Sequence, residues 1–116
     1  MVIFYFRSAL AQRARSYLHS NCSNCHSPSG PTPVNLDLRY TTTLGATQTC
    51  NVQPTAGDLG ISNARIIAPA EPERSVLLAR MKVRDDNQMP PLGSHLVDQD
   101  AVDVIAAWIS GLASCN

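Results

Sequence analysis

The residues best suited to chemistry in this sequence lie in one short run, Cys22–His26. The run has the pattern C-x-x-C-H, which is typical of covalent c-type haem attachment. Two thiols three residues apart on one helical turn point the same way, so both can add to vinyl groups along one edge of the macrocycle. The next residue then gives an imidazole nitrogen to the iron. We therefore expect Cys22, Cys25 and His26 to hold one haem c.

Two other uses of paired cysteines fit the surroundings less well. A thioredoxin-type redox pair follows a strand and begins a helix, whereas here a helical pattern leads into the motif. A structural zinc site needs four ligands, usually from a second C-x-x-C or two histidines. The other cysteines, Cys50 and Cys115, stand alone in the sequence. Haem is the favoured cofactor, and a structural metal-binding module without haem is the alternative.

Met89 is the candidate for the second axial ligand of the iron. It lies far downstream of the motif, so a different wall of a pocket can present it. Pro90 favours an extended backbone at the residue before it, and Pro90 and Pro91 would stiffen a loop that holds a weak thioether ligand. Methionines also fill gaps in cores. Met81 is the rival methionine, although its place in a helical stripe favours packing.

Two histidines are further rivals for this second ligand position. His19 lies too close to the attachment turn to reach the opposite face of the ring, and His95 is expected in a loop or at the surface. Ligation by His26 and Met89 raises the reduction potential and leaves no open iron position. Closed coordination favours electron transfer over catalysis, with exchange at the ring edge near the thioethers. The alternative is a haem enzyme or gas sensor in which Met89 dissociates.

Cys50 and Cys115 remain once the haem has taken the other two of the four cysteines. An even number of cysteines in a small chain suggests an oxidising compartment. We therefore expect a Cys50–Cys115 disulfide in a periplasmic or secreted protein. The alternative is a pair of free thiols.

Length and charge limit the class of protein. The chain of 116 residues is expected to form one domain, 1–116, with residues 1–7 as a linker. Nine basic and nine acidic residues balance, which argues against nucleic acid as a partner because such binding needs a basic face. No apolar run approaches the ~20 residues of a membrane-spanning helix. The apolar segment 2–6 is too short for a signal-peptide core.

Three stretches carry the apolar periodicity of helices. The first runs from about Ser8, a good N-cap residue, to His19. A shorter helix is expected over Glu73–Met81. The last begins after Asp98, which can cap it, and ends near Gly111. Its apolar stripe consists of Val102, Ile105, Ala106, Ile109 and Leu112.

Loops are expected to connect these helices. The stretch 27–69 contains repeated prolines and glycines, which mark turns and loops. The run Asp85–Gln88 ends the short helix, and Met89–Gly93 is expected as a non-helical strap. The overall pattern predicts an all-α domain.

Several segments resemble a class I cytochrome c domain, and the resemblance covers nearly the whole chain from about Ala9. More narrowly, the chain is similar to single-haem domains appended to secreted bacterial proteins that oxidise carbohydrates or degrade polysaccharides. The segments that carry the resemblance are Ala14–His19, Asn35–Tyr40, Gly57–Gly60, Ala64–Ile67, Met89–Leu92 and Trp108–Ile109.

The resemblance implies a small cytochrome c fold, with N- and C-terminal helices, a short third helix and long loops around one haem. It implies His26 as the proximal and Met89 as the distal ligand. The disulfide pair departs from the simplest cytochromes and fits the narrower group. The domain is then expected to be a monomer, not itself an enzyme, and to exchange electrons with a redox protein or a fused oxidoreductase domain that oxidises carbohydrate.

Two further roles belong to this expectation. The Pro31 carbonyl is the expected acceptor for the Nδ1 proton of His26. The side chains expected within reach of the haem propionates, where arginine is the usual partner, are Arg39, Tyr40, Arg65 and Arg80.

Overall fold

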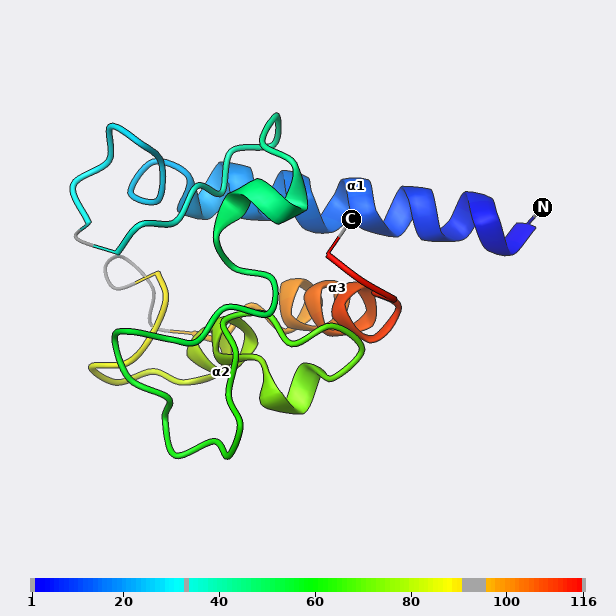
Figure 1. Ribbon diagram of the computed structural model, residues 1–116. Coiled ribbons are helices and arrows are strands. Elements are labelled where there is room, and N and C mark those ends of the chain that lie inside the picture. Colours follow the sequence, from blue (N-terminus) through cyan, green and yellow to red (C-terminus); the bar gives the residue numbers. More distant parts are fainter. Residues whose placement is uncertain (1, 33, 91–95, 116) are drawn as a thin grey trace.

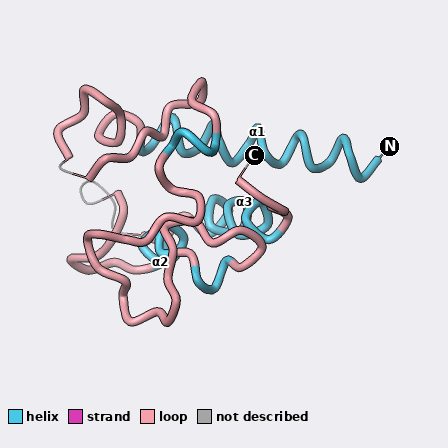
Figure 2. Tube along the Cα trace, in the orientation of Figure 1, coloured by secondary structure: helices cyan, strands magenta, loops and turns pink. Residues whose placement is uncertain are grey.

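The computed structural model describes residues 2–32, 34–90 and 96–115 (Figure 1). Within them lie three α-helices, α1 (Val2–Cys22), α2 (Val76–Lys82) and α3 (Gln99–Ser110). Two short 3-10 helices, η1 (Leu44–Thr47) and η2 (Pro72–Arg74), lie in the connecting segments. The described residues form no strand, and Figure 2 shows loops and turns between the helices. This agrees with the predicted all-α class.

Helix α1 begins earlier and ends later than the sequence pattern predicted. The expected helix ran from about Ser8 to His19, whereas the structure has helix over Val2–Cys22. Neither glycine nor proline occurs in this stretch, so nothing in the backbone forces an end at either predicted boundary. Residues 2–7, expected as a linker, are therefore helical. The helix now runs directly into the attachment motif.

The hydrophobic core is formed by the three helices together with two loop residues, Leu38 and Ile67. Helices α1 and α3 make the most extensive pairing of elements, and Figure 1 shows α1 passing over the end of α3. Burying each large aliphatic side chain is worth about 1.5–3 kcal/mol. The buried cluster consists of Ala14, Leu18, Leu38, Ile67, Leu78, Met81, Ala101, Val102, Ile105, Trp108 and Ile109.

Helix α3 matches its prediction closely. The Asp98 carboxylate accepts a hydrogen bond from the Ala101 backbone N–H at 3.1 Å, which satisfies one of the free donors of the first turn. Gly111 follows the last helical residue. Val102, Ile105 and Ile109 of the predicted stripe are buried in the core.

The short helix is divided by Ser75, which the sequence pattern did not predict. Ser75 has an extended backbone (φ −95°, ψ 108°) between η2 and α2. Its buried hydroxyl oxygen accepts from the Ala68 N–H at 2.9 Å, and the hydroxyl donates to the Glu71 carbonyl at 3.1 Å. A serine that bonds the backbone in this way competes with continuous helix. Helix α2 therefore starts at Val76 instead of Glu73.

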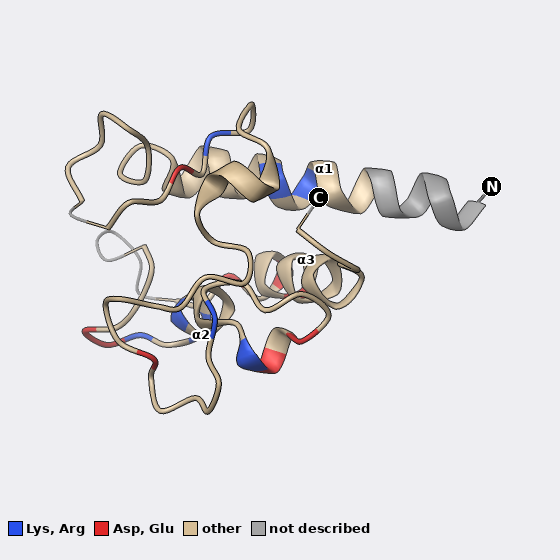
Figure 3. Cartoon of the chain, viewed as in Figure 1, with Lys and Arg blue, Asp and Glu red and all other residues tan. Residues whose placement is uncertain are grey.

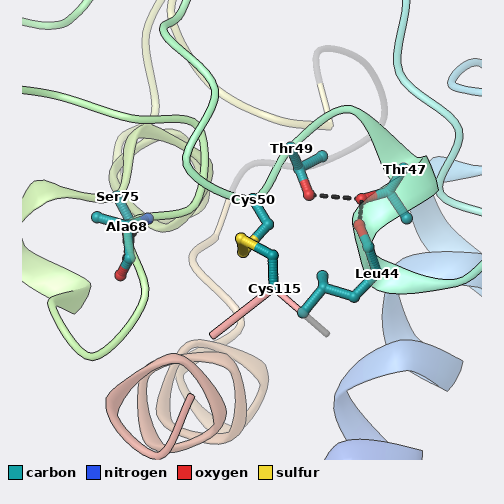
Figure 4. Close-up of a disulfide and its surroundings, with 7 residues drawn as sticks. All are labelled: Leu44, Thr47, Thr49, Cys50, Ala68, Ser75 and Cys115. Carbon is teal, nitrogen blue, oxygen red and sulfur yellow. Dashed lines mark hydrogen bonds between the residues drawn. A yellow bond between two sulfur atoms is a disulfide. The ribbon is translucent and has the colours of Figure 1, made fainter. Parts of the chain in front are cut away.

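The long loop is tied to the end of the chain by a disulfide between Cys50 and Cys115 (Figure 4). Their Cα atoms are 5.6 Å apart, within the usual range for disulfides. Close by, the Thr47 and Thr49 hydroxyls share a buried hydrogen bond of 2.7 Å. The pairing agrees with the prediction from the cysteine count. In the described part of the chain, no helix is long and apolar enough to cross a membrane.

Candidate functional site

The C-x-x-C-H motif lies where α1 turns into the long loop. Cys22 is the last helical residue, and its carbonyl accepts hydrogen bonds from the backbone N–H groups of Cys25 (3.2 Å) and His26 (2.8 Å). This extra turn holds both cysteines and the histidine beside the same end of the helix. Cys22 and Cys25 are free thiols, the first partly buried and the second exposed.

One cavity brings together all four predicted haem-binding residues. Cys22, Cys25, His26 and Met89 lie on its wall, and its empty volume, counting the open mouth, is about 1000 Å³. Most of its lining is apolar. The other lining residues are Leu18, Asn21, Thr32, Val34, Leu36, Leu38, Pro54, Thr55, Ala56, Gly57, Ile66, Val76, Leu77, Arg80, Met81 and Pro90.

The His26 imidazole is half-buried, and its Nδ1 atom lies 3.4 Å from the Thr32 hydroxyl. That hydroxyl can donate its own proton to the Cys25 carbonyl (3.2 Å) or the Val34 carbonyl (3.3 Å), so it is free to accept from Nδ1–H. In that tautomer, Nε2 keeps the lone pair that binds a metal. Burial lowers the pKa of His26, which favours the neutral, metal-binding form.

Thr32 is a site residue that the sequence analysis missed. The Pro31 carbonyl was expected to accept the Nδ1 proton, but the polar atom that the structure puts next to Nδ1 belongs to the following residue. The available signal was a threonine hydroxyl six residues after the histidine, in the loop that follows the motif. Leu38 helps to fold it, because its N–H donates to the His26 carbonyl at 2.8 Å.

The environment of the Cys22 thiol does not favour thiolate chemistry. Burial, with a smaller contribution from the neighbouring Cys25, raises the pKa of the Cys22 thiol to about 11. Reactive and metal-binding cysteines are thiolates and have lowered pKa values. Among the described residues, no group of three or more His, Cys, Asp or Glu side chains is arranged to hold a metal ion.

Both methionines considered as distal ligands reach the cavity. Met89 is half-buried and lies on the segment 83–90, which we call the distal segment. Met81 is only 5% exposed and belongs to the packed core cluster on α2. The Met89 N–H donates to the Arg80 carbonyl at 2.9 Å, and the Met89–Pro90 peptide bond is cis. His95, Pro91 and the rest of the predicted strap lie outside the described residues.

Of the four side chains expected near propionates, only Arg80 lines the cavity. Arg39 instead pairs with Asp37 at 2.8 Å, and its hydrogen bonds hold the pKa of that carboxyl well below its usual range. Arg65 donates to the Ala64 carbonyl. The Tyr40 N–H donates to Nδ1 of His19. His19, considered above as an alternative iron ligand, does not line the cavity.

Basic and acidic residues are interspersed along the described chain (Figure 3). Comparisons of the chain with protein-family models, with curated protein sequences and with solved structures found no match.

Proposed function

We propose that this chain is a monohaem c-type cytochrome domain that carries single electrons between redox partners. The observation that carries the proposal is the apolar cavity, because Cys22, Cys25, His26 and Met89 all lie on its wall. The donor set suits the group: free thiols for two thioether bonds, and an imidazole and a thioether as axial ligands. The fold proposed is the small cytochrome c fold.

Each of these residues has a defined task in the proposed domain. When bound, haem would supply a one-electron iron couple at the centre of the cavity. Cys22 and Cys25 tether one edge of the ring, and the exposure of Cys25 leaves that edge nearest to a docking partner. His26 and Met89 would hold the iron and would leave no coordination position for substrate. The apolar lining keeps water away from the metal and thereby tunes its potential.

The wider setting follows from the same residues. A disulfide is typical of oxidising compartments, so we propose a periplasmic or secreted location. The proposed partner is a redox protein or an attached oxidoreductase domain that oxidises carbohydrate. The domain itself is proposed to be a monomer and not an enzyme.

The proposal is tested by producing the chain together with the haem-attachment machinery. We expect covalent haem by mass spectrometry, lost in Cys22→Ser/Cys25→Ser, and a low-spin spectrum in both oxidation states. Met89→Ala should abolish the far-red absorption band that reports sulfur ligation of ferric iron. Met81→Ala is the matched control and should keep the band, since Met81 is assigned to the core.

Two results would overturn the proposal. Absence of covalent haem would leave a structural module as the better hypothesis. Rapid carbon monoxide binding to the reduced native protein at neutral pH would show that Met89 leaves the iron readily, and would favour a gas sensor or haem enzyme. Loss of the sulfur band in Met81→Ala, but not in Met89→Ala, would move the distal ligand to α2.

A further inference from the structure

We propose that Arg80 is the positioning residue for Met89, holding the distal segment at the cavity through its guanidinium and its backbone. The inference rests on the proposed role of Met89 as iron ligand. It assigns Arg80 a task beyond the propionate contact expected from the sequence: both of its terminal nitrogens donate to backbone carbonyls.

Four hydrogen bonds make the connection. Arg80 Nη1 donates to the Asn87 carbonyl at 3.1 Å. Nη2 donates to the Ala56 carbonyl at 2.8 Å and to the Gly57 carbonyl at 3.4 Å. In the other direction, the Arg80 carbonyl accepts from the Met89 N–H at 2.9 Å. One residue thus holds the distal segment at two points and the loop 54–57 at two more.

These contacts join three separate parts of the cavity wall. The loop 54–57, helix α2 and the distal segment each contribute lining residues, and Arg80 lies in the last turn of α2. Helix α2 is itself anchored in the core through Leu78 and Met81. Arg80 therefore fixes the loop 54–57 and the distal segment to a helix that is anchored in the core.

The side chain has to be arginine for this arrangement. A guanidinium presents several N–H donors in a rigid planar fork, whereas a lysine ammonium is a compact point charge on a flexible stem. Here the fork reaches Asn87 with one terminal nitrogen and the loop carbonyls with the other. Gly57, at φ +104°, is in a backbone region that favours glycine, and its carbonyl meets the fork.

The link to function is preorganisation. A thioether is a weak iron ligand, so its bond to the metal depends on a loop that is already held in place before ligation. Without Arg80, Met89 would spend more time away from the iron, and an added ligand would compete with it more successfully. The apparent affinity of ferric iron for imidazole therefore reports how firmly Met89 is held.

The test compares imidazole binding to the ferric holoprotein in wild type, Arg80→Lys and Arg80→Gln. Losing the hydrogen bonds that only the planar fork makes should tighten the apparent imidazole affinity by about tenfold in both variants, and weaken the far-red sulfur band. Arg65→Lys is the matched control, because Arg65 does not line the cavity and donates to its neighbour Ala64. It should bind imidazole like wild type. Wild-type affinity in Arg80→Lys would overturn the fork as the source of positioning.

A double variant separates this inference from the proposed function. In a Met89→Ala background, Arg80→Lys should change imidazole affinity no further, because the ligand through which it acts is gone. If Met89→Ala alone binds imidazole like wild type, Met89 is no ligand and both proposals fail. If Met89→Ala binds more tightly but Arg80→Lys matches wild type, only the Arg80 inference fails.

Hydrogen exchange gives a second readout, and its first part needs only the wild-type holoprotein. The Met89 amide of the wild-type holoprotein should be protected, because its partner is the Arg80 carbonyl, and its exchange should quicken in Arg80→Lys. Exchange at the rate of an unprotected amide in wild type would overturn the positioning of this segment.

Discussion

At the scale of single residues, the Thr32 hydroxyl is the contact on which the proposed proximal ligand depends. It lies 3.4 Å from His26 Nδ1 and also within reach of two backbone carbonyls. Partners of this kind fix the orientation and tautomer of a metal-binding histidine and raise its basicity. In the proposed domain, Thr32 is thus a positioning residue that would act on the iron through His26.

The first prediction concerns Thr32→Val, which keeps the shape and removes the acceptor. A less basic imidazole stabilises ferric iron less well, so the reduction potential should rise, by roughly 40 mV if the hydrogen bond is worth about 1 kcal/mol in a one-electron couple. Voltammetry of the holoprotein measures it. Thr55→Val is the control, since Thr55 lines the same cavity and has no such contact with His26. Equal shifts in both variants would contradict the assignment.

At the scale of elements, the turn after the motif is closed so tightly that it requires glycine at Gly30. A Cβ atom there would overlap the carbonyl carbon and oxygen of Cys25, which are backbone atoms and cannot rotate away. The Gly30 N–H also donates to the Ser27 carbonyl at 2.9 Å. The turn therefore packs directly against the backbone that carries the attachment motif.

The second prediction is that Gly30→Ala displaces this backbone. Overpacking of this kind costs about 1–3 kcal/mol, so the free energy of unfolding in urea should fall by that amount, and the yield of covalent haem should fall with it. Gly45→Ala provides the comparison, because a Cβ atom there would lie at an ordinary 3.5 Å from the Cys115 carbonyl oxygen. Wild-type stability and haem yield in Gly30→Ala would refute the prediction.

Element boundaries show the limits of local patterns. The cap and apolar stripe of α3 were predictable because both depend on residues close in sequence. The division of the short helix at Ser75 was not predictable, because the Ser75 hydroxyl accepts a hydrogen bond from the Ala68 N–H in another segment. The early start of α1 at Val2 was missed because Ser8 has the chemistry of a cap but lies inside the helix.

At the scale of the whole molecule, the Cys50–Cys115 disulfide spans 65 residues and connects the middle of the long loop to the end of the chain. In the chain-entropy account, a cross-link over such a span stabilises the folded state by about 4 kcal/mol. Neither cysteine is among the residues that line the cavity. The cross-link is therefore assigned to stability and not to the cavity.

The third prediction separates these two properties. The double variant Cys50→Ala/Cys115→Ala should lose about 2–4 kcal/mol of unfolding free energy, measured by chemical denaturation, while its reduction potential stays at the wild-type value. Treating the wild type with a thiol reductant should produce the same loss. A potential that shifted along with stability would show that the disulfide shapes the cavity after all.

The chemistry within a few residues was determined by the sequence alone. Some signals act locally or through composition: the C-x-x-C-H spacing, the proline after Met89, the cap of α3 and the even cysteine count. Together with the helical periodicity, they predicted the all-α class and the disulfide. They also singled out four candidate haem-binding residues, which the structure places on the wall of one cavity.

Only the tertiary structure decided which partners those residues have. It put Thr32 beside His26 where Pro31 was expected, and it gave Arg80 to the backbone of the loop 54–57 and the distal segment. The Arg80–Ala56 contact joins residues 24 positions apart. No local periodicity encodes such a pairing, because it depends on how the packed core brings α2 and the loops together. The C-x-x-C-H motif can be identified in the sequence, whereas the rest of the cavity wall is assembled only by the fold.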